Sequence, residues 1–223
     1  MENQKTNVII FACTQMELHL EAAQQKMHTN YPVVWLDRIY HRDPKEMRQV
    51  ILDETEKVPS HIDTILVAMG FCGGSWENVP VKKRVVIPKV DDCITMLLHT
   101  NKRSAANLKE AGHFYLVQCE EGNYSLKGMK KKLCEDYGDE NGKYVFDVWF
   151  ESYLSADIID TGVYDCRSSE YIQQAKENAD LIHCPLCYVD GSNIVLEKLV
   201  AGQWDQQFIV AEPGRVLANI EFM

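Results

Sequence analysis

Three cysteines and a histidine each stand shortly after a segment that has the composition of a β-strand. Cys13 follows "NVIIFA", His41 follows "PVVWLD", Cys72 follows "TILVAMG" and Cys93 follows "RVVIPKV". The carboxyl ends of parallel strands share one edge of a sheet, and open α/β folds bind their ligands at that edge. Thiolates select soft metals such as zinc, copper(I) or an iron–sulfur cluster. The sequence therefore predicts a metal site built from these four side chains.

His41 has two predicted roles, as the fourth metal ligand or as a catalytic acid or base beside the metal. Asp43 has the position of a helix N-cap, so His41 lies just ahead of a helix. Cys13 precedes Thr14 and Glu17, which have the spacing of a capping box. Because helix N-termini favour anions, we expect a thiol at such a position to have a lowered pKa. The alternative is that the four are unrelated residues near helix starts.

Cys72 lies in the segment "GFCGG", residues 70–74, whose glycines allow backbone amides to turn towards a ligand. Cys93 falls in the opening turn of a helix that Asp91 or Asp92 is expected to cap. The segment "GFCGG" is not a dinucleotide-binding fingerprint, because it lacks the pattern G-x-G-x-x-G. The sequence also has no Walker phosphate loop. The predicted cofactor-binding residues are Gly70, Gly73, Gly74 and Asp92.

Cys184 and Cys187 have the C-x-x-C spacing of a metal knuckle or a dithiol redox pair. No second C-x-x-C and no trailing histidine pair accompany them, and Cys187 enters a predicted strand, so packing in the core is the simpler explanation. Cys119 ends the predicted strand "HFYLVQ", which makes it a reserve ligand at the same sheet edge.

Composition excludes several classes of protein. The chain has 223 residues, 46% of them hydrophobic, and a formal net charge of −10. This charge argues against general binding to nucleic acids or anionic membranes, because both require clustered cations. No apolar run approaches the roughly 20 residues of a membrane span, and the start "MENQKTNVIIFAC" has no signal-peptide pattern. We therefore expect a cytoplasmic protein whose eight cysteines are mostly reduced.

Predicted strands and helices alternate along the chain, which favours an α/β fold with a mainly parallel, Rossmann-like sheet covered by helices. Further predicted strands are "HFYLVQ", "ADIIDTG", "LCYVD" and "QFIVAEP", and the predicted helices include "MELHLEAAQQKMH", "PKEMRQVILDETEKV", "SEYIQQAKENAD" and "IVLEKLVAG". Residues 120–152 are expected to hold helical pieces around a turn at Gly138 to Gly142. We expect one domain over residues 1–223; if it has two lobes, their boundary lies near 120–150.

Six segments carry a family resemblance: "FAC" at 11–13, "YHRDP" at 40–44, "GFCGG" at 70–74, "IPKVDDCITMLL" at 87–98, "DTGVYD" at 160–165 and "LEKLVAGQWDQQFIVAEPG" at 196–214. Together they resemble the bacterial and archaeal family known as domain of unknown function 1638. The resemblance covers most of the chain, and it implies that the family's patterned ligands fall on Cys13, His41, Cys72 and Cys93. Where members often carry a Thr-x-Gly-Trp element, this chain has "VQCEEGNY".

The resemblance also implies a metabolic context. Members are similar to proteins encoded beside corrinoid-dependent methyltransferases of anaerobic one-carbon metabolism. The context implies a metal-dependent transferase or an accessory of one, with an iron–sulfur cluster preferred over zinc as the metal centre. A corrinoid is a further possible cofactor. The implied partners are a corrinoid protein or methyltransferase, or a small-molecule substrate. Two alternatives stay open, a non-catalytic accessory that binds a corrinoid or its protein, and a thiol redox protein that uses Cys184 and Cys187.

Overall fold

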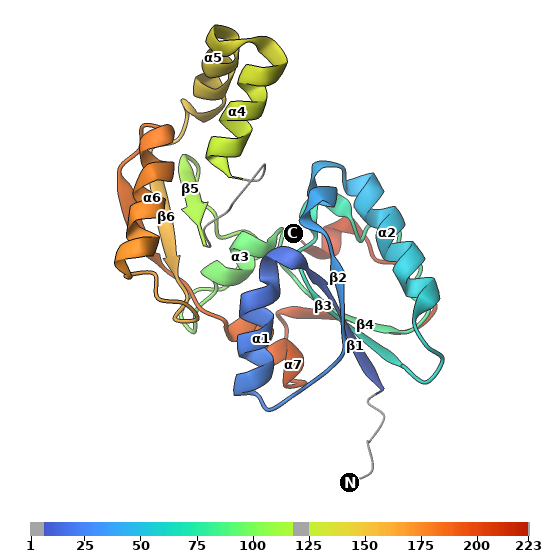
Figure 1. Cartoon of the computed structure of the whole chain (residues 1–223). Coiled ribbons are helices and arrows are strands. Elements are labelled where there is room, and N and C mark those ends of the chain that lie inside the picture. The colour runs from blue at the N-terminus through green and yellow to red at the C-terminus, as the bar shows by residue number, and fades with distance from the viewer. Residues whose placement is uncertain (1–6, 118–124, 223) are drawn as a thin grey trace. The chain divides into compact units, whose positions relative to one another are not determined.

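The computed structural model describes residues 7–117 and 125–222 (Figure 1). The chain forms two compact units, of which the first comprises Met1–Leu108 with Ser192–Met223 and the second comprises Lys109–Gly191. The second unit is thus an insertion between two segments of the first. Within the described ranges no helix is long and apolar enough to cross a membrane.

The first unit is built on a five-stranded sheet with the strand order β2-β1-β3-β4-β8. The strands are β1 Val8–Cys13, β2 Val33–Leu36, β3 Thr64–Ala68, β4 Arg84–Pro88 and β8 Phe208–Ala211. The first four run parallel, and β8 pairs antiparallel with β4. All five residues of β3 are buried, as expected for a central strand that helices cover on both faces. The carboxyl ends of β1 to β4 therefore lie at one edge.

Helices flank this sheet, with α1 and α7 on one face and α2 on the other (Figure 1). They are α1 Glu17–Lys26, α2 Pro44–Lys57, α3 Cys93–Leu98 and α7 Ile194–Val200, with short 3-10 helices η1 Thr14–Met16, η2 Arg38–Arg42, η3 Cys72–Gly74 and η5 Asn219–Phe222. Helix α1 packs against α7. Nδ2 of Asn193, just before α7, donates to the backbone oxygen of His19 in α1 at 2.7 Å.

The second unit has a three-stranded parallel sheet in the order β5-β6-β7. Its elements are β5 His113–Leu116, α4 Leu126–Tyr137, α5 Asp139–Phe150, β6 Ser155–Asp160, α6 Ser169–Leu181 and β7 Leu186–Asp190. Apolar side chains from one face of the sheet, among them Leu116 and Ile158, pack with Leu133 of α4, Phe146 of α5 and Ala175 of α6 in a buried core. All three helices of this unit thus contribute to the core on one face of its sheet.

The predicted α/β fold with mainly parallel sheets is confirmed. Two local predictions are wrong. The turn predicted for 138–142 is confined to Gly138, because α5 already begins at Asp139. Gly142 lies inside α5 and allows its close packing on α4, since a Cβ there would meet the backbone of Cys134 at 2.5 Å. Thr14 does not cap α1, since Met16 holds that position and the Thr14 hydroxyl oxygen accepts the N–H of Arg38 at 3.1 Å.

Candidate functional site

The structure places the four predicted site residues at the same edge of the large sheet. Cys13 is the last residue of β1, and His41 lies in η2 after β2. Cys72 opens η3 after β3, and Cys93 is the first residue of α3 after β4. The parallel direction of the four strands brings these residues together, as the sequence pattern predicted.

Within this group, a thiol and an imidazole are in direct contact. Sγ of Cys13 lies 3.3 Å from Nε2 of His41, within hydrogen-bonding distance for sulfur. Cys13 is fully buried, whereas His41 is partly exposed. The pKa of His41 is raised, mainly by its hydrogen bond to Cys13, while burial acts in the opposite direction. The ring therefore links the buried thiol to the surface of the protein.

Cys93 continues the contact to the third cysteine. Its thiol hydrogen-bonds with the thiols of both Cys13 and Cys72. The backbone N–H of Gly70 also donates to the sulfur of Cys93. The four side chains thus form a row in the order His41, Cys13, Cys93, Cys72, which we call the thiol row.

The pKa values of Cys13 and Cys93 are both raised. The pKa of Cys13 is raised by the hydrogen bond with Cys93 and by burial, against the lowering effect of His41. The hydrogen bond from Cys13 lowers the pKa of Cys93, but Cys72 and burial outweigh it, so the net shift is well upward. The lowered pKa that the sequence predicted for Cys13 is therefore wrong. Burial beside another thiol opposes the thiolate more strongly than the helix start favours it.

Cys72 has an unusual backbone conformation. Its φ is 46°, and Gly73 and Gly74 follow with φ of 69° and 97°. Only glycine adopts such angles readily, so Cys72 is held in a strained conformation by its surroundings. Two backbone hydrogen bonds do this, from Phe71 N–H to the oxygen of Val90 at 2.9 Å and from Cys72 N–H to Asp91 at 2.7 Å. The chain thus holds Cys72 beside the start of α3.

Gly70 allows this close approach. A Cβ at Gly70 would lie 2.4 Å from Cα of Asp92, a contact that no side chain can make. The Asp92 carboxylate in turn caps α3 by accepting the N–H of Thr95 at 2.9 Å, so the predicted cap is confirmed. Cys93 follows directly, and its position relative to Cys72 therefore depends on the contact between Gly70 and Asp92.

The other predicted glycines also make contacts within the protein. A Cβ at Gly73 would meet the ring of Pro44 at 2.9 Å, so this loop lies against the start of α2. The backbone oxygen of Gly74 accepts a hydrogen bond from Nη2 of Arg48 at 2.6 Å. Cofactor binding by Gly70, Gly73, Gly74 and Asp92 stays a prediction.

The donors do not form a preassembled metal shell. Among residues 7–117 and 125–222, no group of three or more His, Cys, Asp or Glu side chains is arranged to hold a metal ion. The contacts within the thiol row are pairwise, from one side chain to the next. Metal ligation by Cys13, His41, Cys72 and Cys93 therefore stays a prediction.

The second cysteine pair differs from the thiol row. Cys184 is buried, and its thiol donates to the backbone oxygens of Tyr153 at 3.3 Å and Ile182 at 3.4 Å. Cys187 is exposed and lies in β7. Burial raises the pKa of Cys184, and neither residue stands at a helix start, the position that activates dithiol redox pairs. Cys119, the reserve ligand, lies outside the described residues.

Sequence reasoning missed one polar pair. His113 and Asp157 lie near the amino ends of neighbouring strands and are in hydrogen-bonding contact at 2.5 Å. The signal was weak, because His113 opens the short run "HFYL" and Asp157 is one of three polar residues in "SADIID". Only the pairing of β5 with β6 brings them together.

Comparison with known protein families shows the family of this chain. Residues 35–200 match the family model described as "Protein of unknown function (DUF1638)". The chain belongs to the DUF1638 family. Within the range that the DUF1638 model matches lie His41, Cys72 and Cys93, whereas Cys13 precedes it. No curated protein and no solved structure gives a significant match.

Proposed function

We propose that this DUF1638 protein binds one soft metal centre, an iron–sulfur cluster or zinc, through Cys13, Cys72 and Cys93, with His41 as a fourth ligand or an adjacent acid or base. The observation that supports this most strongly is the position of Cys93, whose thiol contacts two other cysteines from different loops at one sheet edge. Three thiols and an imidazole are one of the donor sets that bind zinc, and they also suit a cluster with one distinct iron.

The donor types fit the metal, and the arrangement requires a small change. On metal binding, a cation would replace the thiol protons of the row. It would also draw the sulfurs together around one point. Cys72 is only partly buried, so it is the thiol through which a metal or a substrate reaches Cys13 and Cys93. When bound, zinc supplies a Lewis acid that lowers the pKa of a thiol substrate, and a cluster supplies electron transfer.

Metal analysis of reduced protein purified without oxygen tests this proposal. We expect iron with acid-labile sulfide, or zinc, at about one centre per chain. Cys72→Ser and Cys93→Ser should each remove most of it, because serine is a poor ligand for soft metals. Cys184→Ser with Cys187→Ser is the matched control and should leave the metal content unchanged. The proposal would be contradicted if the protein held no metal after reconstitution with iron and sulfide or with zinc. It would also be contradicted if only the control variant lost its metal.

A role in corrinoid-dependent methyl transfer is a second part of the proposal. It is supported by the family resemblance alone, and it makes the protein either a metal-dependent transferase or an accessory of one. The test adds the metal-loaded protein to a corrinoid protein with its methyltransferase and measures the rate of methyl transfer and the fraction of active corrinoid. An increase in the rate or in the active fraction, abolished by Cys93→Ser, would support a role in methyl transfer. No change in the rate or in the active fraction would contradict it.

A further inference from the structure

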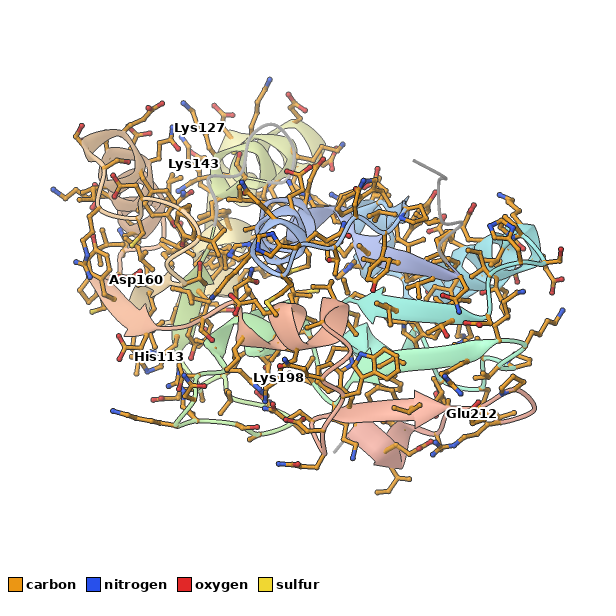
Figure 2. The ribbon with its side chains drawn as sticks, turned by 90° about the horizontal axis from the view of Figure 1, so that it is seen from below. His113, Lys127, Lys143, Asp160, Lys198 and Glu212 are labelled. Carbon is orange, nitrogen blue, oxygen red and sulfur yellow. The ribbon has the colours of Figure 1, made fainter. Side chains whose placement is uncertain are left out.

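His113 and Asp157 form a hydrogen-bonded pair on the small sheet, where Figure 2 labels His113. Nδ1 of His113 lies 2.5 Å from Oδ2 of Asp157 and 3.1 Å from Oγ of Ser155. In the parallel register of β5 and β6, His113 pairs with Ser155, and Tyr115 pairs with Asp157. Alternate residues of a strand point to opposite faces, so these four side chains share the face that does not carry the apolar core.

The carboxylate determines the state of the ring. An ionised carboxylate only accepts hydrogen bonds, so Nδ1 of His113 must donate its proton to Asp157. In the neutral ring Nε2 then carries a lone pair. The Asp157 side chain is 6% exposed and that of His113 is 33% exposed, so the carboxylate is buried while the ring reaches the surface. Histidines that bind metals are usually held in this way by a carboxylate on the other nitrogen.

A second carboxylate faces the other nitrogen. Oε2 of Glu110 lies 3.7 Å from Nε2 of His113, which is too long for a hydrogen bond. Zinc binds imidazole nitrogen and carboxylate oxygen at about 2.0 to 2.2 Å, which places two such donors on a tetrahedral ion about 3.4 Å apart. The Glu110 side chain is 67% exposed and can make this small adjustment. Its backbone is anchored, because the Glu110 N–H donates to the hydroxyl of Tyr115 at 2.9 Å.

We propose that Nε2 of His113 and the carboxylate of Glu110 bind a divalent cation of the zinc class, and that Asp157 positions the ring. The cation would bind the lone pair of Nε2 and balance the charges of the two carboxylates. Within the described part of the chain no third His, Cys, Asp or Glu completes a shell, so water fills the remaining positions. This site is separate from the thiol row in its residues and in its nitrogen and oxygen donors, and it does not depend on the proposed function.

Zinc titration of the reduced full chain, followed by the ring nitrogen resonances of histidine, tests the site. We expect zinc to move the Nε2 resonance of His113 and not that of exposed His61, with the resonance of His41 reporting separately on the thiol row. Glu110→Gln and Asp157→Asn should each weaken zinc binding at His113 by about 10-fold or more. Glu110→Gln changes an exposed side chain, so it tests the site even if Asp157→Asn impairs folding.

The competing explanation is a protonated His113 held between two carboxylates as a structural ion pair. In that case the Nε2 resonance would not move at zinc concentrations up to about 1 mM, a level that detects any site with a dissociation constant below it. That result would overturn the proposal, and so would a zinc affinity at His113 that Glu110→Gln leaves unchanged. Glu177→Gln, at another exposed position of the same unit, is the matched control and should have no effect.

Discussion

Sγ of Cys13 lies 3.3 Å from Nε2 of His41, although 28 positions separate them in the chain. The contact follows from strand pairing, since Cys13 at the end of β1 is in register with Leu36 at the end of β2, five residues before His41. Helix α1 returns the chain to the start of β2, so the carboxyl ends of both strands meet at one edge. The imidazole is thereby held next to a thiol that solvent does not reach.

The first prediction concerns this contact. If His41 is a ligand, His41→Ala should weaken metal retention by about 10-fold or more, because the centre loses one donor. If His41 is an acid or base, the metal should stay and any activity should fall by about 10²-fold. Dialysis against a chelator followed by metal analysis separates the two, with His61→Ala at an exposed position as control. Full metal content and full activity in His41→Ala would remove His41 from the site.

The second prediction concerns Gly70. Gly70→Ala would place a Cβ 2.4 Å from Cα of Asp92, and the backbone has to move to relieve the clash. We expect a loss of about 3 kcal/mol in the free energy of unfolding and a loss of bound metal, because Cys93 shifts away from Cys72. Urea denaturation and metal analysis measure the two effects.

Gly202→Ala separates the clash from general backbone strain. Gly202 has a φ of 72° with nothing within 4 Å of a Cβ, so alanine there should cost about 1 kcal/mol and leave the metal in place. Equal losses of stability and of metal in the two variants would show that the approach of Gly70 to Asp92 has no special role.

The third prediction concerns the cap of α3. Asp92→Ala removes the acceptor for the N–H of Thr95 and should lower the free energy of unfolding by about 1 kcal/mol. Asp92→Asn keeps an acceptor oxygen and should stay close to the parent protein, since asparagine caps about as well as aspartate. Urea midpoints of the two variants give the comparison. If Asp92→Asn lowered the free energy of unfolding as much as Asp92→Ala, the charge of Asp92 and not its capping hydrogen bond would be responsible.

The fourth prediction is a dependence of stability on pH. Burial in α1 lowers the pKa of His19 to about 4. In the unfolded chain the pKa is about 6.5, so above this pH neither state binds the proton and the stability is complete. As the pH falls from 6.5 to 4, His19 is protonated mainly in the unfolded chain. The free energy of unfolding therefore falls by up to about 3 kcal/mol.

Urea denaturation at pH 7, 5.5 and 4 measures this loss. His19→Gln removes the titrating group, so its stability should fall less steeply over the same range even if it is lower throughout. His61→Gln at an exposed position should keep the slope of the parent protein. If His19→Gln and the parent show the same slope, His19 does not cause the acid sensitivity.

Much of the fold could be predicted from the sequence because its signals are local. Apolar runs such as "TILVA" and "LCYVD" produce the strands β3 and β7 within about two residues of the predicted bounds. Asp43 and Asp92 cap their helices as predicted, because a cap needs only a side-chain oxygen and a backbone N–H two or three residues later. The convergence of the four ligand-type residues followed from the parallel order of the strands.

Tertiary structure alone decided how these residues meet. The order of the thiol row and the upward pKa shift of Cys13 depend on burial and on contacts between distant loops, which no spacing encodes. The approach of Gly70 to Asp92 and the contact of His113 with Asp157 likewise join segments that are far apart in the chain. A residue pattern determines local conformation through interactions within a few residues, whereas the environment of a side chain is set by whichever distant segments pack around it.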